Sequence, residues 1–292
     1  HLAGILRVQI GLAEDAHSRA AYRSRLAALE ENQLKDKKAA FSTWADAIRD
    51  ATTDPELDRL LDSYERLAGA LGEDTILDII DLYRKIEPDI LAETTRMRVQ
   101  QTVAKHAIRL GDLPLATDYY GRIVERRPDD DAALEALEKI YEQQGDDEHL
   151  FEVLGRRAEL AGSEKAELAL RRRAALLARK LGRHEEAIAA WERVWAVQDS
   201  NAEAVAALEA LYAELGRWED LANLLERRLE LGDSAGVAVD LRFRLAEIQL
   251  QQLANRNRAL GYLGTVLAGE PDHGGAIAIL EGMLSDPEVG IP

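Results

Sequence analysis

The sequence has no cysteine and little proline or aromatic content, and each shortage excludes a class of structure. Without cysteine, the 292-residue chain can form no disulfide bond, thiolate metal site or cysteine nucleophile. Only seven prolines and 5% aromatic residues, in a background rich in Ala, Leu, Glu and Arg, favour helix throughout. No run approaches 18 uncharged apolar residues, so no direct membrane insertion is expected. These shortages leave the cellular compartment and the oligomeric state open.

The chain is acidic, with 37 Lys and Arg residues against 54 Asp and Glu residues and a formal net charge of −17. Such a surface repels nucleic acid at long range, so no nucleic-acid partner is expected, and solubility is its simplest meaning. The 47% hydrophobic content is enough to fold. Because 292 residues are near the upper size of a single core, either two domains or a repeat array is expected.

No catalytic, metal or cofactor site is predicted from the sequence. The six histidines show no HExxH motif or paired ligand spacing, and the glycines occur singly, without a phosphate-binding loop. The acidic run at Asp129, Asp130 and Asp131 lacks the alternating ligands of a calcium loop and is typical of a helix N-cap. We therefore expect a protein that is not an enzyme and that needs no cofactor.

A motif at residues 180–191, KLGRHEEAIAAW, occurs in four copies whose leucines are 76, 71 and 72 residues apart. The copies share a leucine, an alanine six residues later and a bulky apolar residue ten residues later: Leu34, Ala40 and Trp44; Leu110, Ala116 and Tyr120; Leu181, Ala187 and Trp191; Leu253, Ala259 and Leu263. A small and then a large residue at i and i+4 lie on one helical face and let a neighbouring helix approach closely. The motif therefore predicts helix-pair packing.

A second type of turn alternates with the first. It has Gly72, Gly145 or Gly216, each followed five residues later by a leucine: Leu77, Leu150 or Leu221. Prolines at residues 55, 128 and 271 fall at the expected joins between hairpins. The pattern predicts about 16 helices, with no strand, in seven complete hairpins and half a hairpin at each end.

The two ends of the chain match the interiors of hairpins. Residues 1–13 align without a gap on residues 149–161, and residues 275–284 match the first helix of the second hairpin type before residues 285–292 depart from it. We therefore expect one continuous array over residues 1–292, which is part of a longer protein.

These copies resemble tetratricopeptide repeats (TPR). Tyr141 and Tyr212 stand before their turn glycines as the family's aromatic does, and Gly182, Ala187 and Trp191 match the family's later positions. Leucine at the family's small position in the second hairpin type is a departure, and the pattern is most similar to the divergent paired repeats of long bacterial proteins. The resemblance implies a right-handed α-solenoid of antiparallel helix hairpins.

Charge alternates between the two types of first helix. The formal charges are +1, +2, +4 and 0 in the first type and −2, −4 and −3 in the second. One interpretation is that neighbouring helices of opposite sign pair along the stack, which contributes about 0 to 1 kcal/mol for each exposed pair. The other is a groove for a mixed-charge peptide or a partner helix.

In the resembled family, one position of the first helix faces a concave groove and binds a partner peptide. Carrying that position over gives four partner-binding candidates, and nearby basic residues give four more: Arg25, Gln101, Arg172 and Arg244; Arg98, Lys105, Arg109 and Arg179. The family's asparagine partners are replaced by Leu29, Leu176 and Ile248, so a carboxylate clamp of the family's kind is not expected.

Three functional hypotheses remain open from the sequence. The leading one is a non-enzymatic scaffold that binds a protein or peptide along its concave groove. The second is a regulatory or substrate-recruiting arm of a larger enzyme. The third is an architectural spacer or a self-assembling array.

Overall fold

The structure, a computed structural model, describes residues 1–232 and 235–284. These residues form helices and no strand, which confirms the predicted all-α fold of about 16 helices. The α-helices are α1 (Leu2–Leu12), α2 (Ala16–Asn32), α3 (Lys37–Asp50), α4 (Leu57–Leu71), α5 (Ile76–Ile86), α6 (Glu93–Leu110), α7 (Leu113–Arg126), α8 (Asp131–Gln144), α9 (Asp147–Leu160), α10 (Glu164–Lys180), α11 (His184–Val197), α12 (Ala202–Glu214), α13 (Trp218–Leu231), α14 (Ala235–Gln251), α15 (Arg256–Gly269) and α16 (Gly274–Leu284). Two 3-10 helices, η1 (Glu73–Thr75) and η2 (Glu87–Asp89), flank α5.

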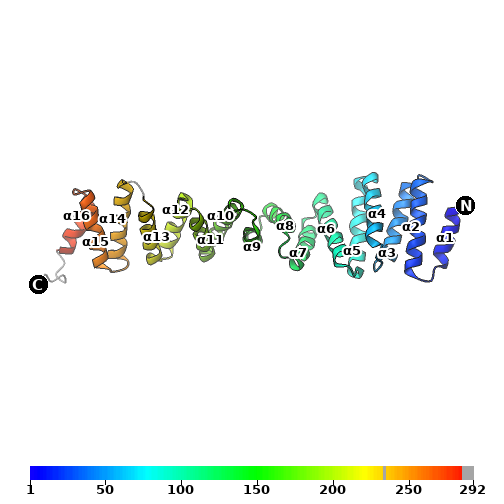
Figure 1. The fold of residues 1–292 in the computed structure, drawn as a ribbon, viewed down its shortest axis with the longest axis horizontal. Helices are drawn as coiled ribbons and strands as arrows, with labels where there is room; N and C mark the ends of the chain where they lie inside the picture. The colour runs from blue at the N-terminus through cyan, green and yellow to red at the C-terminus, as the bar shows by residue number, and fades with distance from the viewer. Residues whose placement is uncertain (233–234, 285–292) are drawn as a thin grey trace. The chain divides into compact units, whose positions relative to one another are not determined.

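The described helices from α2 to α15 form seven hairpins, while α1 and α16 stand as single helices, as the alignment of the chain ends predicts (Figure 1). The chain divides into two compact units, His1–Leu160 and Ala161–Pro292. Within each unit the hairpins follow one another in chain order, the arrangement of an α-solenoid. One continuous array over residues 1–292 stays a prediction, and residues 285–292, which it includes, lie outside the described residues.

The small and large residues of the four-copy motif lie in the core, which confirms their predicted packing role. Each of its four alanines is 0% exposed and is therefore fully covered by surrounding atoms. The bulky residues are also buried, with Trp191 at 1% and Leu263 at 0% exposure. The sequence therefore identified these core positions from spacing alone.

The turns of the four motif copies share one backbone feature, a residue with positive φ. Gly111 and Gly182 have φ of 74° and 73°, as glycine readily allows. In the first and last copies the equivalent residues are Lys35 at 59° and Ala254 at 52°, which have a Cβ and are therefore strained. The first and last copies therefore keep the positive φ of the turn although they lack glycine, the residue that adopts it most readily.

The first copy of the second hairpin type departs from the sequence pattern. Leu150 and Leu221 are buried, at 9% and 4% exposure, but Leu77 is 62% exposed. The cause is the 3-10 helix η1, which follows Gly72 and shifts the start of α5, so that Ile76 is buried at 5% exposure instead. Contrary to the sequence pattern, Leu77 therefore does not pack as the other two leucines do.

Side-chain caps fix several helix starts. The Asp130 side chain accepts a hydrogen bond from the Ala133 backbone N–H at 3.0 Å, which confirms that the acidic run at residues 129–131 is an N-cap. Pro114 lies in the first turn of α7, as expected from its missing N–H.

Candidate functional site

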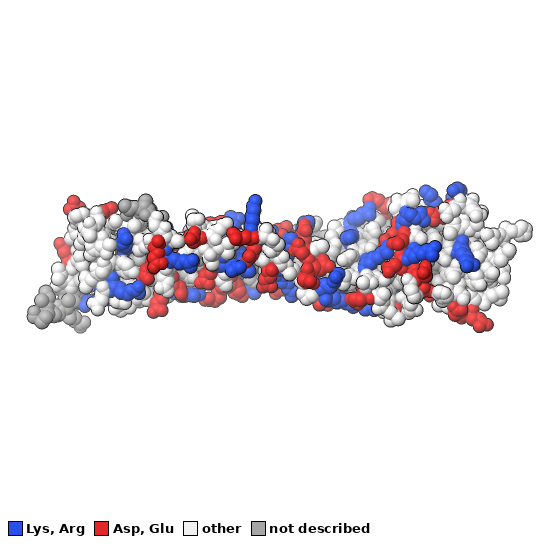
Figure 2. Space-filling model, in the orientation of Figure 1, with Lys and Arg blue, Asp and Glu red and all other residues white. Residues whose placement is uncertain are grey.

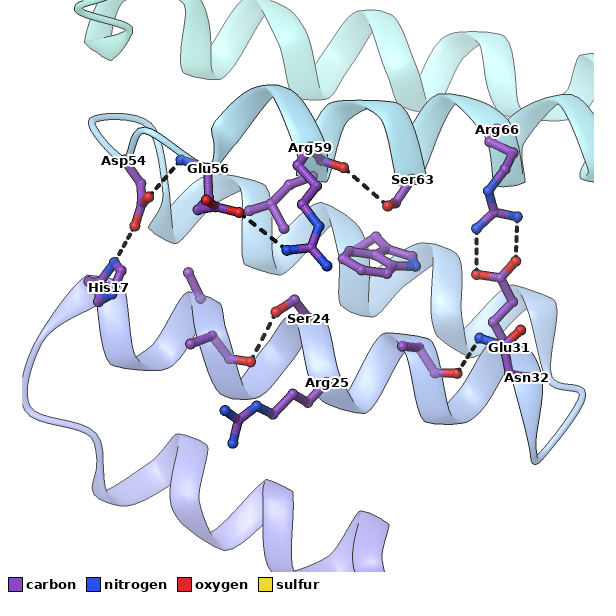
Figure 3. Close-up of a pocket in the computed structure, with 15 residues that line it drawn as sticks. His17, Ser24, Arg25, Glu31, Asn32, Asp54, Glu56, Arg59, Ser63 and Arg66 are labelled. Atoms are coloured by element: carbon purple, nitrogen blue, oxygen red, sulfur yellow. Dashed lines mark hydrogen bonds and ion pairs between the residues drawn. The ribbon is translucent and has the colours of Figure 1, made fainter.

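A groove of about 490 Å³ lies between the first helices of two successive hairpins, α2 and α4 (Figure 3). We call it the α2–α4 groove, and all of it belongs to the unit His1–Leu160. Apolar lining comes from Ala20, Ala21, Ala28, Trp44 and Leu60; polar lining comes from His17, Ser24, Arg25, Glu31, Asn32, Asp54, Glu56, Arg59, Ser63 and Arg66.

One end of the groove is closed by His17 and Asp54 (Figure 3). Asp15 caps α2 by accepting a hydrogen bond from the Ser18 backbone N–H at 2.7 Å, and this cap sets His17 in the first turn. Asp54, in the loop before α4, accepts a hydrogen bond from the Glu56 backbone N–H at 2.8 Å and also binds Nδ1 of His17. The bond to Asp54, and then its charge, raises the pKa of His17. The Glu56 N–H, and then His17, lowers the pKa of Asp54.

The other end of the groove is closed by a two-pronged ion pair between α4 and α2. Arg66 donates hydrogen bonds from its two terminal nitrogens to the two carboxylate oxygens of Glu31, at 2.5 and 2.8 Å. These bonds lower the pKa of the Glu31 carboxyl group. A fork of this geometry holds the two helices in one register.

Between the two ends, the basic side chains make fewer contacts with described residues. Arg59 reaches from α4 toward α2 and contacts Glu56 at 3.3 Å, while Arg25, on the α2 side, has no ion pair among the described residues (Figure 3). The Trp44 indole is 7% exposed, and its Nε1 makes no hydrogen bond of ordinary geometry within the described chain. It still lies close enough to Glu31 to help lower the pKa of that carboxyl group. The groove therefore has an apolar floor, and at its edge lies Arg25, which no described residue pairs with.

Arg98, one of the sequence-predicted partner-binding residues, forms ion pairs within the chain. On α6, it lies 2.7 Å from both Asp62 and Glu65 of α4 and 3.7 Å from Asp58. Arg109, near the C-terminal end of the same helix, forms an ion pair with Glu73 at 2.9 Å.

The candidates of the unit Ala161–Pro292 behave in the same way. Arg172 and Arg179 on α10 lie 2.5 Å from Glu203 and 4.0 Å from Glu214 of α12. Arg244 of α14 lies 2.8 Å from Glu209 of α12. Basic and acidic side chains are interspersed on the face shown in Figure 2, as such pairing produces. Opposite charges on neighbouring first helices therefore pair, one of the two interpretations of the charge alternation.

Three candidates have no ion pair or side-chain hydrogen bond among residues 1–232 and 235–284: Arg25, Gln101 and Lys105. Arg25 lines the α2–α4 groove. Lys105 lines a second hollow of about 540 Å³, between α4, α5 and α6, together with Arg109. The eight candidates thus comprise five that are paired within the chain and three that pair with no described residue.

Most residues of the groove were not predicted from the sequence. Arg59, Arg66 and Asp54 were not singled out, and Trp44 was assigned to packing alone. A signal was present, because Arg66 and Glu31 are 35 residues apart, close to one hairpin length, as are Arg244 and Glu209. Searching for opposite charges one hairpin apart would have found these pairs.

No group of three or more His, Asp or Glu side chains in the described parts of the chain could hold a metal ion. Among the described helices, none combines the length and apolar character that crossing a membrane requires.

No protein-family model matches the sequence, and no curated protein matches it. Solved structures do match. A tetratricopeptide repeat protein from Parabacteroides merdae is 14% identical with a TM-score of 0.38, and the match covers 90% of this chain and 97% of that one. The TPR protein YrrB, described as having an unusual peptide-binding site, is 15% identical with a TM-score of 0.32, covering 63% of this chain and 91% of its own. A chain of the Naa15/Naa10 complex bound to HypK-THB is 15% identical with a TM-score of 0.43, covering 94% of this chain and 40% of its own.

The chain's own hairpins carry the assignment of its fold. A turn residue with positive φ, a fully buried alanine and a buried bulky residue recur in all four copies of the motif. Tyr141 and Tyr212 precede the equivalent turns of the alternating hairpins. The chain is an all-α helical repeat protein whose hairpins resemble divergent tetratricopeptide repeats.

Proposed function

We propose that the chain is a non-enzymatic protein-interaction scaffold that binds a peptide or a partner helix between its first helices. The observation that carries this proposal is the α2–α4 groove, which combines an apolar floor with exposed basic side chains, among them Arg25, which no described residue pairs with. Concave sites with this composition are the usual places for a ligand to bind.

The eight candidate residues differ in what binding would require of them. Arg25, Gln101 and Lys105 can contact a partner directly. The other five would first have to release a carboxylate of their own chain, as Arg98 would release Asp62 and Glu65. Breaking such a pair reduces the net gain from a new contact. We therefore expect the direct contacts to centre on Arg25 and Lys105.

Site-specific photo-crosslinking tests the proposal. A photo-reactive residue replaces Ser63, which lines the groove, and in a control protein it replaces Ser42, an exposed residue of α3 outside it. Crosslinking is carried out in the cells that make the protein, and the products are identified by mass spectrometry. We expect one defined protein to be linked through residue 63 and not through residue 42. Equal and unselective products from both positions would reject binding in the groove.

A further inference from the structure

The acidic and basic side chains of the α2–α4 groove differ in their exposure to solvent. In each of its two end pairs, the acid lies beneath the base. The Asp54 side chain is 8% exposed while that of His17 is 74% exposed, and the Glu31 side chain is 12% exposed while that of Arg66 is 59% exposed. A ligand that approaches the groove therefore meets the nitrogen atoms of these pairs before it meets their carboxylates.

The middle of the groove adds to this imbalance. The Arg59 side chain is 83% exposed, and its contact with Glu56 at 3.3 Å is between two exposed groups, which contributes little. Arg25 has no ion pair in the described structure. Glu56 is the one lining carboxylate with a largely exposed side chain, at 62%. On a chain with a net charge of −17, the groove thus presents a local surface that is positive at its mouth.

The floor of the groove supplies apolar contact, and the Trp44 indole N–H is buried beneath it. The Trp44 ring, Leu60 and three alanines supply apolar surface. The buried Nε1 of Trp44 can only donate, and it lacks a hydrogen-bond acceptor of ordinary geometry among the described residues. A segment with a small apolar side chain and negative charge would complement the apolar floor and the positive mouth.

We propose that the α2–α4 groove binds an acidic peptide segment, with internal Asp or Glu side chains paired to Arg25 and Arg59 and a small apolar side chain on Trp44. This inference rests on the proposed function, since it names the chemistry of the peptide. The cationic groups are spread along the groove, from His17 at one end to Arg66 at the other (Figure 3). That spread suits several carboxylates along a segment better than it suits one terminal carboxylate.

Fluorescence anisotropy with labelled synthetic peptides tests the inference. Three 12-residue peptides share the same alanine and leucine positions and carry Glu, Gln or Lys at the others. All are acetylated and amidated, so that no terminal carboxylate is present. We expect the Glu peptide to bind, the other two to bind at least tenfold more weakly, and added salt to weaken the Glu peptide.

A charge-reversed protein identifies the site. The double variant Arg25→Glu and Arg59→Glu should lose about tenfold or more in affinity for the Glu peptide. The control Arg49→Glu and Lys85→Glu changes the net charge equally outside the groove, and its affinity should stay within about twofold of wild type. In a parallel measurement, the Trp44 indole N–H resonance, assigned with Trp44→Phe, should shift on binding. Circular dichroism checks that both double variants remain folded. If the variant with Arg25→Glu and Arg59→Glu does not fold, the variant with Arg25→Gln and Arg59→Gln replaces it.

Three results would overturn the inference. The first is unchanged affinity in the groove variant. The second is binding of a fourth peptide, the Glu sequence with a free C-terminal carboxylate, without binding of the amidated Glu peptide. The third is binding of a single-stranded RNA through the same residues without binding of the Glu peptide. Failure here is distinguishable from failure of the proposed function. A defined partner crosslinked through residue 63 that binds by a neutral or basic segment would leave the scaffold proposal standing and reject only the acidic ligand.

Discussion

Arg244 of α14 donates a hydrogen bond from Nη2 to Oε2 of Glu209 on α12, at 2.8 Å. The other oxygen of the same carboxylate accepts a hydrogen bond from Arg228 of α13 at 2.7 Å. One side chain, 17% exposed, therefore connects three consecutive helices. Glu209 thus has a structural role within the chain.

Glu209→Gln should destabilise the protein by about 1 kcal/mol, because an amide keeps the size of the side chain but loses both charge-assisted bonds in a partly exposed site. The free energy of unfolding in urea measures this. Glu203→Gln is the matched control, since Glu203 and its partner Arg172 are 44% and 50% exposed, and it should cost less than about 0.5 kcal/mol. Equal costs for the two variants would contradict the bridging role.

The four-copy motif predicts the cost of changing its small and large positions. Trp191→Ala removes a side chain that is 1% exposed and should cost about 3 to 5 kcal/mol. Ala187→Leu inserts a larger group where no space exists and should cost about 1 to 3 kcal/mol. Chemical denaturation measures both, and Ala189→Leu, at an exposed position of the same helix, serves as the control. Values within half a kcal/mol of wild type for both core variants would reject the packing assignment.

The strained turn at Ala254 offers a stabilising change. With φ of 52°, Ala254 has a left-handed backbone conformation that costs an L-residue about 1 to 2 kcal/mol. Glycine removes this strain, but it also gives the unfolded chain more conformational entropy, so only part of the strain energy appears as added stability. Ala254→Gly should therefore stabilise the protein by about 0.5 to 1 kcal/mol. The reverse change in the equivalent turn, Gly182→Ala, should destabilise it by about 1 kcal/mol, since φ is 73° there. Thermal unfolding that moves both variants in the same direction would contradict this account.

The pair of His17 and Asp54 makes one end of the groove sensitive to pH. The pKa of His17 is raised in the folded chain, so its contribution is complete below the ordinary histidine pKa of 6.5 and is lost as pH rises through the raised value. The pKa of Asp54 is lowered, so its contribution is complete above the ordinary value of 3.8 and is lost as pH falls through the lowered value. The pair is therefore at full strength between about pH 4 and pH 6.5.

An NMR titration of the His17 imidazole checks this. The midpoint should lie above 6.5 in the wild type and fall toward that value in Asp54→Asn. The asparagine can still accept the hydrogen bond from the Glu56 N–H, so the loop keeps its shape. A midpoint that does not move would show that Asp54 has no effect on His17.

The hairpins could be predicted because their signals are local. Ala187 and Trp191 are four residues apart on one helix, so their spacing alone specifies a packed face. The turn at Gly72 was less predictable, because the shift introduced by η1 changes which of Ile76 and Leu77 is buried without changing the composition of the segment.

The α2–α4 groove depends on residues from three different helices and a loop. Glu31 and Arg66 meet only when two hairpins stack, and the exposure that separates His17 from Asp54 is a property of the folded surface. Arg25 was predicted as a candidate by its register position. Its distinction from Arg172, which has the same register position but pairs with Glu203, required the structure.

The ion pairs that join neighbouring first helices link residues only 31 to 40 positions apart in the sequence. Each pair can form as soon as two adjacent hairpins are present, without waiting for distant parts of the chain. Contacts of such short sequence separation go with fast folding, which can nucleate at more than one place. On a ribosome, the first hairpins could therefore acquire their final electrostatic links while later ones are still being synthesised.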